Sequence, residues 1–228
     1  MCRFIFYASK DQKQTNIRKP LMNFANMCKK TNTPNGDKQE DGWGVYYKKN
    51  NKEYLFKSTK PIWEDKEVIN NLNYASIFIA HARSSSFKNH KNQIEFNQPY
   101  IKDNLIFVFN GFLKNVSITS LPGKIGAQKI FNLIIENTKK EKNDLKKSIK
   151  KTIEIIKKNT QQIFGLNFLV FDSQKLYVYS FASVNHSYYQ LYLFQDRKII
   201  SLSSSPGIYN KIKQQKIPFD YLLEYKIQ

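Results

Sequence analysis

The second residue of the chain, Cys2, can supply a nucleophile together with its own base. Removal of Met1, which is common before a small residue, would leave Cys2 with both a thiol and a free α-amine. A free α-amine, with a pKa of roughly 7.7–8.0, and a free thiol, with a pKa of about 8.5, both titrate close to neutral pH. The amine can therefore accept the thiol proton and activate the sulfur for covalent catalysis. Taken alone, a cysteine at this position is equally typical of a small buried residue.

Two further stretches place polar side chains directly after apolar runs. Arg83 follows one such run and leads into Ser84–Ser86. Its planar guanidinium can bind a carboxylate of a substrate, or form an ion pair with a structural acid. Asn110 and Gly111 follow another apolar run. A side-chain amide beside a glycine N–H can form a two-donor oxyanion hole, although an ordinary Asn-Gly turn is the alternative.

A fourth stretch, Asp41-Gly42-Trp43-Gly44, combines two glycines with a large aromatic side chain. Glycine allows another group to approach the backbone closely, and the indole offers a flat apolar wall. We therefore include Trp43 and Gly44 among the candidate substrate-binding residues. Arginine is scarce, since only 4 of the 37 basic residues are arginines, and two of those, Arg3 and Arg83, lie beside Cys2 and Ser84–Ser86. Because lysine would serve on a surface, an arginine at these places suggests a planar, bidentate contact.

Composition excludes several functional classes. The chain has 228 residues, of which 41% are hydrophobic and 24% charged, as in globular proteins. A net charge of +19 is typical of proteins that bind nucleic acid or anionic membranes. Surfaces that read bases favour arginine, however, and 33 of the 37 basic residues are lysines, so nucleic-acid binding is disfavoured. No apolar run is long enough for a membrane helix.

Cys2 and Cys28 are too few for a disulfide framework or a four-thiolate zinc site. No cluster of histidine, cysteine or acidic residues has the spacing of metal ligands. The sequence therefore predicts a cytoplasmic protein without a metal or a cofactor.

Hydrophobic periodicity predicts helices and strands that come in blocks. Helices are expected over 17–30, 64–72, 125–137 and 141–158, the last with a buried stripe of Leu145, Ile149, Ile153 and Ile156. Strands are expected over 3–8, 45–49, 53–58, 75–82, 105–109, 163–172, 175–182, 188–195, 198–204 and 221–227. Blocks of helices and strands argue against a doubly wound parallel sheet. They predict an α+β fold of antiparallel sheets covered by helix layers, in one domain spanning residues 1–228.

Five motifs in this order resemble the class II glutamine amidotransferases, which are N-terminal-nucleophile hydrolases. They are Met1-Cys2-Arg3, Asp41-Gly42-Trp43-Gly44, His81-Ala82-Arg83-Ser84-Ser85-Ser86, Asn97-Gln98-Pro99-Tyr100 and Phe109-Asn110-Gly111. Leu166–Leu169 and Ser203–Pro206 also resemble the stand-alone branch of the family. The resemblance implies a four-layer αββα sandwich with two antiparallel sheets between helix layers.

The resemblance also implies a role for each candidate residue. Cys2 would be the nucleophile and its α-amine the base, while Asn110 and the Gly111 N–H would form the oxyanion hole. Arg83 would hold the α-carboxylate of glutamine, and Ser86 stands where the family usually has threonine near the substrate. The thiolate would attack the side-chain amide of glutamine or a related γ-glutamyl amide, release ammonia and leave a thioester that water hydrolyses.

One position departs from the family pattern. Gly126 stands where the family usually has an aspartate that binds the α-amine of glutamine. Either another acid such as Asp41 replaces it, or the substrate has no free α-amine, or the activity is weak or lost. The last case would make the protein a regulatory or binding subunit. An active enzyme would release ammonia or pass it to a separate synthetase subunit, and the sequence leaves a homo-oligomer open.

Overall fold

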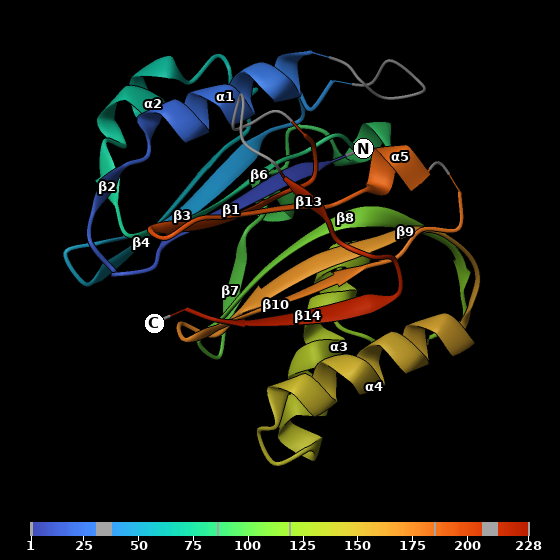
Figure 1. Ribbon diagram of the computed structural model, residues 1–228. Helices are drawn as coiled ribbons and strands as arrows, with labels where there is room; N and C mark the ends of the chain where they lie inside the picture. Colours follow the sequence, from blue (N-terminus) through green and yellow to red (C-terminus); the bar gives the residue numbers. More distant parts are fainter. Residues whose placement is uncertain are drawn as a thin grey trace.

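The computed structural model describes residues 2–30, 38–85, 87–118, 120–184, 186–206 and 214–227. These residues form two antiparallel sheets that pack face to face (Figure 1). The larger sheet has the strand order β13 (Gln215–Lys216), β11 (Tyr192–Gln195), β12 (Ile199–Ser203), β1 (Arg3–Ser9), β6 (Ile77–Ala82), β3 (Trp43–Lys49) and β4 (Lys52–Ser58). The smaller has the order β14 (Tyr221–Lys226), β10 (Lys175–Ser180), β9 (Thr160–Phe171), β8 (Leu105–Val116) and β7 (Tyr100–Lys102).

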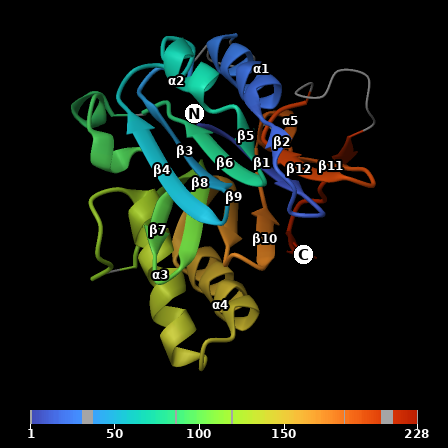
Figure 2. The ribbon, with the colours of Figure 1, turned by 90° about the vertical axis from the view of Figure 1, so that its left-hand side faces the viewer.

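Helices cover the outer face of each sheet (Figures 1 and 2). The larger sheet is covered by α1 (Arg18–Lys29) and α2 (Lys66–Asn71), and the smaller by α3 (Gly126–Lys140) and α4 (Leu145–Lys158). The remaining elements are short: β2 (Thr15–Asn16) pairs with β5 (Tyr74–Ala75), and η1 (Lys88–His90), η2 (Ile94–Phe96) and α5 (His186–Tyr189) lie in connections.

Successive side chains of each strand point to opposite faces of its sheet, and this explains the layers. In β1, Phe4 and Phe6 point into the core between the sheets, whereas Ile5 and Tyr7 pack against the α1–α2 layer. In β8, Val108 points between the sheets and its neighbours point toward α3 and α4. Since successive side chains of a strand point to opposite faces, apolar residues at consecutive positions can fill two cores at once. The order helix, sheet, sheet, helix confirms the predicted four-layer αββα sandwich.

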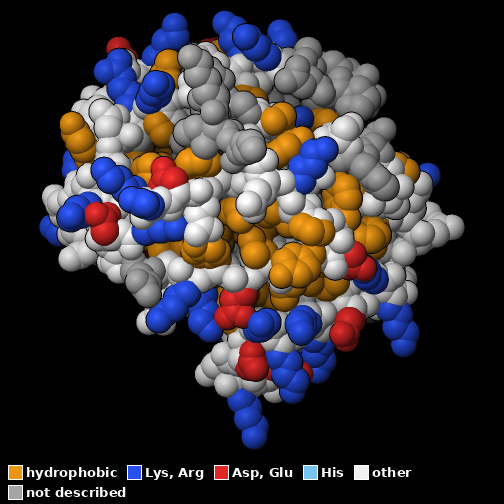
Figure 3. Space-filling view, viewed as in Figure 1, with side chains coloured by type: hydrophobic (Ala, Val, Ile, Leu, Met, Phe, Trp, Pro, Cys, Tyr) orange, Lys and Arg blue, Asp and Glu red, His pale blue; other side chains and the backbone are white. Residues whose placement is uncertain are grey.

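Helix α4 confirms the predicted apolar stripe. Leu145, Ile149, Ile153 and Ile156 are all buried in the core under the smaller sheet. The helix begins later than predicted because the side chain of Asp144 accepts a hydrogen bond from the Lys147 N–H at 3.0 Å and caps the first turn. Lysine and acidic side chains cover the outer surface of this helix pair (Figure 3).

Several predicted strand boundaries are wrong, and two of them concern the site. The strand predicted over 105–109 continues through Asn110 and Gly111 to Val116, because β9 pairs with it along this whole length. The segment 188–195 is not one strand, since its first residues end α5. Side chains bind the carbonyl groups there: Arg3 donates to the Tyr188 carbonyl and Asn167 to the Tyr189 carbonyl.

A buried histidine joins the two sheets near the end of β6. His81 is fully buried, and its Nε2 lies 3.2 Å from the carbonyl oxygen of Phe109 in β8. Burial, together with the charges of Arg83 and Lys57, lowers the pKa of His81 to about 3, although the hydrogen bond to Phe109 acts in the opposite direction. The ring is therefore neutral near pH 7, and Nε2–H donates to the carbonyl, which can only accept.

This burial makes the folded state sensitive to acid. An unfolded histidine has an ordinary pKa near 6.5, so between pH 6.5 and about 3 the unfolded chain binds a proton that the folded chain excludes. Stability should therefore fall as the pH is lowered through this window. We expect His81→Gln, which stays neutral and keeps a donor, to reduce the slope of unfolding free energy against pH by up to about 1.4 kcal/mol per unit. Urea denaturation from pH 7 to 4 measures both slopes, and equal slopes would contradict the neutral buried ring.

Candidate active site

A cavity of about 610 Å³ lies beside the N-terminal end of β1. Cys2, Arg83, Ser84 and Ser85 line one part of it, and Gly111 and the start of α3 line another. The cavity therefore brings together residues from both sheets that are more than a hundred positions apart in the sequence.

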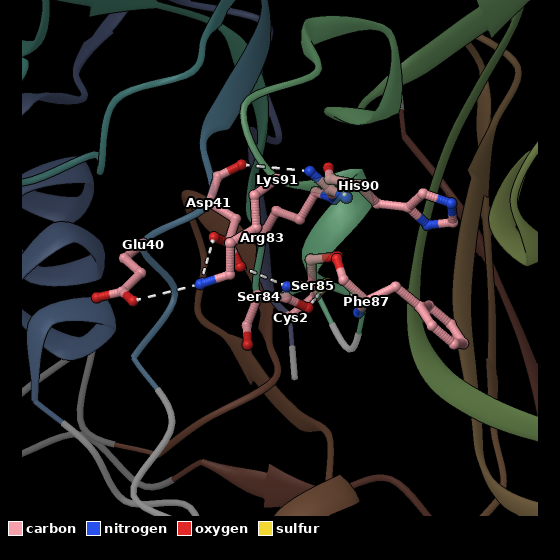
Figure 4. A network of polar contacts seen from close by, with 9 residues as sticks. All are labelled: Cys2, Glu40, Asp41, Arg83, Ser84, Ser85, Phe87, His90 and Lys91. Carbon is pink, nitrogen blue, oxygen red and sulfur yellow. Dashed lines mark hydrogen bonds and ion pairs between the residues drawn. The ribbon is translucent and has the colours of Figure 1, made fainter.

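The larger sheet fixes the position of Cys2. β1 pairs with β12 on one side and with β6 on the other, where Arg3 lies opposite Ala82. Continuing this register by one residue places Cys2 across from Arg83. The Cys2 Sγ lies 3.7 Å from the Ser84 carbonyl oxygen, and Figure 4 shows Cys2 beside Ser84 and Ser85. Cys28 differs, because it lies on the buried face of α1 and burial raises the pKa of its thiol.

Arg3 and Ser204 hold the strand that carries Cys2. The Arg3 Nη1 donates to the Ser204 carbonyl at 2.5 Å and to the Tyr188 carbonyl at 3.1 Å, and its guanidinium lies 4.2 Å from the centre of the Tyr188 ring. The Phe4 N–H donates to the Ser204 Oγ at 2.9 Å. This scarce arginine therefore anchors the strand next to Cys2 instead of facing the cavity.

Arg83 is 4% exposed and lies in the cavity wall. Its Nη2 donates to the His90 carbonyl at 2.7 Å and its Nη1 to the Asp41 carbonyl at 3.4 Å, and its guanidinium lies over the Phe96 ring at 5.5 Å. These partners are neutral, and no described carboxylate forms an ion pair with the guanidinium, although Glu95 interacts with its charge from further away. The structural ion pair considered as an alternative for Arg83 is absent from the described part of the chain, and its charge is available to an anionic ligand.

Asp41 is already occupied. Its Oδ2 accepts a hydrogen bond from the Ser85 N–H at 2.6 Å, and its Oδ1 lies 3.3 Å from the Lys91 Nζ (Figure 4). The carboxylate therefore shapes the loop after Arg83, and Asp41 is not among the residues that line the cavity. Ser86, the next predicted site residue, lies outside the described residues.

The Gln98 side chain forms hydrogen bonds with the edge of β8 that faces the cavity. The Phe109 N–H donates to the Gln98 Oε1 at 2.6 Å, and the Gln98 Nε2 donates to the Phe109 carbonyl at 3.4 Å. The Gln98 side chain thus extends the pairing of β7 with β8 ahead of the first residue of β7, Tyr100. Peptide groups two positions apart face the same edge of a strand, so the Gly111 N–H points to this edge and into the cavity. A Cβ at Gly111 would lie 2.1 Å from the Gly165 carbonyl oxygen, so only glycine fits there.

Asn110 is fully buried, yet neither Oδ1 nor Nδ2 has a hydrogen-bond partner in the described structure. Asn167 lies opposite Asn110 on β9, and both polar atoms of its side-chain amide form hydrogen bonds. The Asn167 Nδ2 donates to the Tyr189 carbonyl at 2.6 Å, and its Oδ1 accepts from the Phe181 N–H at 3.1 Å. Asn110 is not itself in the cavity wall, although Phe109 and Gly111 on either side of it are. An unpaired buried amide costs stability, so a native one calls for an explanation.

Trp43 and Gly44 do not line this cavity. The Trp43 side chain is fully buried in the α1–α2 layer and its Nε1 donates to Asp65 Oδ2 at 2.8 Å. A Cβ at Gly44 would lie 2.5 Å from the Gln98 carbonyl oxygen. Gly44 therefore lets Gln98 approach β3, and it acts on the cavity through the Gln98–Phe109 contact.

Sequence reasoning missed the role of Gln98 and the basic side of the cavity. In the sequence Gln98 belongs to the Asn97–Tyr100 motif, but its role depends on hydrogen bonds to the Phe109 backbone in β8, which no local pattern reveals. Lys114, Lys124 and Lys129 line the cavity near the start of α3. Gly126 also lines it, and a Cβ there would meet nothing within 4 Å, so the backbone does not require glycine.

The described residues contain no group of three or more histidine, cysteine or acidic side chains that could hold a metal ion. Within the same residues, no helix has the length and apolarity needed to cross a membrane.

Comparison with known proteins identifies the family. The model of the class-II glutamine amidotransferases matches residues 12–196, a range that begins after Cys2. No curated protein matches the chain.

Similar solved structures include a glutamine aminotransferase class-II domain protein from Silicibacter pomeroyi, with 12% identity and a TM-score of 0.65 over 98% of this chain and 94% of that one. Glutamine phosphoribosylpyrophosphate amidotransferase from B. subtilis has 13% identity and a TM-score of 0.61, over 100% of this chain but 49% of its own. At these low identities the TM-scores show a shared fold and no more, whereas the family model covers most of the chain. The chain therefore belongs to the class-II glutamine amidotransferases.

Proposed function

We propose that the protein is an N-terminal-cysteine amidohydrolase that releases ammonia from glutamine or a related γ-glutamyl amide through a thioester. The observation that supports this most directly is the shared cavity of Cys2, Arg83 and the Gly111 edge of β8, beside a buried Asn110 carboxamide without a partner. These are the groups that acyl transfer needs: a nucleophile, a cation for the substrate carboxylate, and two donors for an oxyanion.

The proposed reaction has two steps. Once Met1 is removed, the Cys2 α-amine takes the thiol proton and the sulfur attacks the side-chain amide carbon. The Gly111 N–H and the Asn110 Nδ2 donate to the developing oxyanion, the C–N bond breaks, and the leaving nitrogen takes a proton and departs as ammonia. Water then attacks the thioester carbon, which yields the carboxylate and returns the proton to the cysteine. Ammonia is either released or delivered to a separate acceptor protein.

Covalent labelling tests the nucleophile. A glutamine-like electrophile should label Cys2 in protein whose mass shows that Met1 is gone, because the free amine activates the thiol. Protein that retains Met1, and the Cys2→Ala variant, should not be labelled, and neither should release ammonia.

Intact mass and peptide mapping distinguish the two cysteines. Cys28 is fully buried and should not react. Labelling of Cys28 without labelling of Cys2 would contradict the proposal, because Cys2 would then not be the activated nucleophile. Correct processing without ammonia release from any amide would instead support a non-catalytic binding subunit, which the glycine at position 126 had left open.

Asn110→Ala separates catalysis from stability. Removing one oxyanion donor typically lowers kcat by about 10²–10³-fold. The Asn110 amide has no partner that the change would orphan, so we expect the free energy of unfolding to fall by less than the loss of a satisfied buried amide would cause.

Asn167→Ala is the matched control, because it removes an amide with two hydrogen bonds from the neighbouring strand. We expect Asn167→Ala to be the less stable of the two variants and Asn110→Ala the less active. Denaturant unfolding and ammonia release measure both, and a similar kcat for Asn110→Ala and the wild type would refute the donor role.

Arg83→Lys tests carboxylate recognition. Lysine keeps the charge but loses the planar fork, so we expect KM to rise by about tenfold with a smaller change in kcat. Labelling of Cys2 by a glutamine-like electrophile should slow, whereas labelling by iodoacetamide, which has no carboxylate, should not. Equal slowing with both reagents would mean that Arg83 acts on the fold and not on the substrate.

A further inference from the structure

The charged side chains among the described residues that line the cavity are all basic. Arg83, Lys114, Lys124 and Lys129 line it, and none of its described lining residues is acidic. Helix α3 begins at Gly126 in the cavity wall, and a helix N-terminus adds partial positive charge there.

The nearest described acids are engaged elsewhere. Asp41 binds the Ser85 N–H and Lys91, as described above. Glu95 does not line the cavity, and its carboxylate lies 3.5 Å from the Lys124 Nζ. An ammonium group entering this cavity would meet a described wall that carries cations and no carboxylate, which is unfavourable.

The cavity is also larger and more apolar than a free amino acid requires. Its volume of about 610 Å³ lies within the range of roughly 300–1,000 Å³ that accommodates drug-sized ligands. Beyond Gly111 it continues along the end of β8 to α3 and α4, where the wall is formed by Phe112, Leu113, Val116, Ile130, Leu133 and Ile156. We call these six residues the apolar chamber.

On the basis of the function proposed above, we propose that the natural substrate is a glutamine-type amide whose α-nitrogen is acylated and therefore uncharged. Arg83 binds its carboxylate, Cys2 attacks its side-chain amide, and the acyl chain occupies the apolar chamber. Acylation removes the ammonium charge that the cavity disfavours. It also adds the apolar surface that the chamber can bury.

Ammonia release from three amides tests the substrate class. The substrates are glutamine, N-acetylglutamine and N-octanoylglutamine, and kcat/KM is measured for the processed protein. We expect the order octanoyl, acetyl, glutamine, with a gain of about threefold to fourfold for each methylene that the chamber buries. Faster release from glutamine than from both acylated amides would overturn this inference and leave the Cys2 chemistry intact. No release from any of them would overturn both proposals.

Gly126→Asp and Gly126→Asn form a matched pair of variants. A Cβ at this position meets nothing within 4 Å, so both side chains fit and differ in charge alone. We expect Gly126→Asp to shift the kcat/KM ratio of glutamine to N-acetylglutamine toward glutamine by on the order of tenfold, because a carboxylate would then face the ammonium. Gly126→Asn should keep the wild-type preference. The same ratio in both variants would overturn the charge argument.

Discussion

The site depends on how the two sheets are held together at the end of β6. Phe109 is the point of contact: its N–H donates to the Gln98 side chain, and its carbonyl accepts from Gln98 and His81. Apolar side chains between the sheets supply attraction but little direction. Buried hydrogen bonds have fixed geometry, so these contacts set where β8 lies relative to β6. Because the register of β6 with β1 also fixes Cys2, they set the distance from the sulfur to the Gly111 edge.

Two neighbouring asparagines differ in how their buried amides are hydrogen-bonded. Asn110 and Asn167 lie opposite each other on β8 and β9, and both are fully buried. Asn167 is bonded to two backbone groups, whereas the Asn110 amide is unpaired in the described structure. A donor that is already satisfied could not bind an oxyanion without breaking a bond. The destabilising arrangement at Asn110 is therefore the one that a preorganised donor requires.

Local periodicity predicted the layers and most of the elements, because each depends on neighbours in the sequence. The α4 stripe is an example, since Ile149 and Ile153 show their face through helical spacing alone. The end of the 105–109 strand was not predictable in this way, because β9, some fifty residues further on, extends the pairing past Asn110. For Trp43, the sequence could not reveal which face of β3 would receive the side chain, and it packs under the helices. Gln98 needed long-range pairing for its role to be visible.

Net charge and local charge give different information about this protein. Much of the +19 charge is carried by lysines on helix surfaces, where several pair with acids, as Lys147 and Lys151 do with Glu141. Such exposed pairs contribute little to stability and specify no ligand. At the cavity, a smaller number of cations faces a confined space whose described wall has no carboxylate. Arg83 is the one buried cation among them, so the position of these few charges would bear on the proposed choice of substrate more directly than the total charge of the chain does.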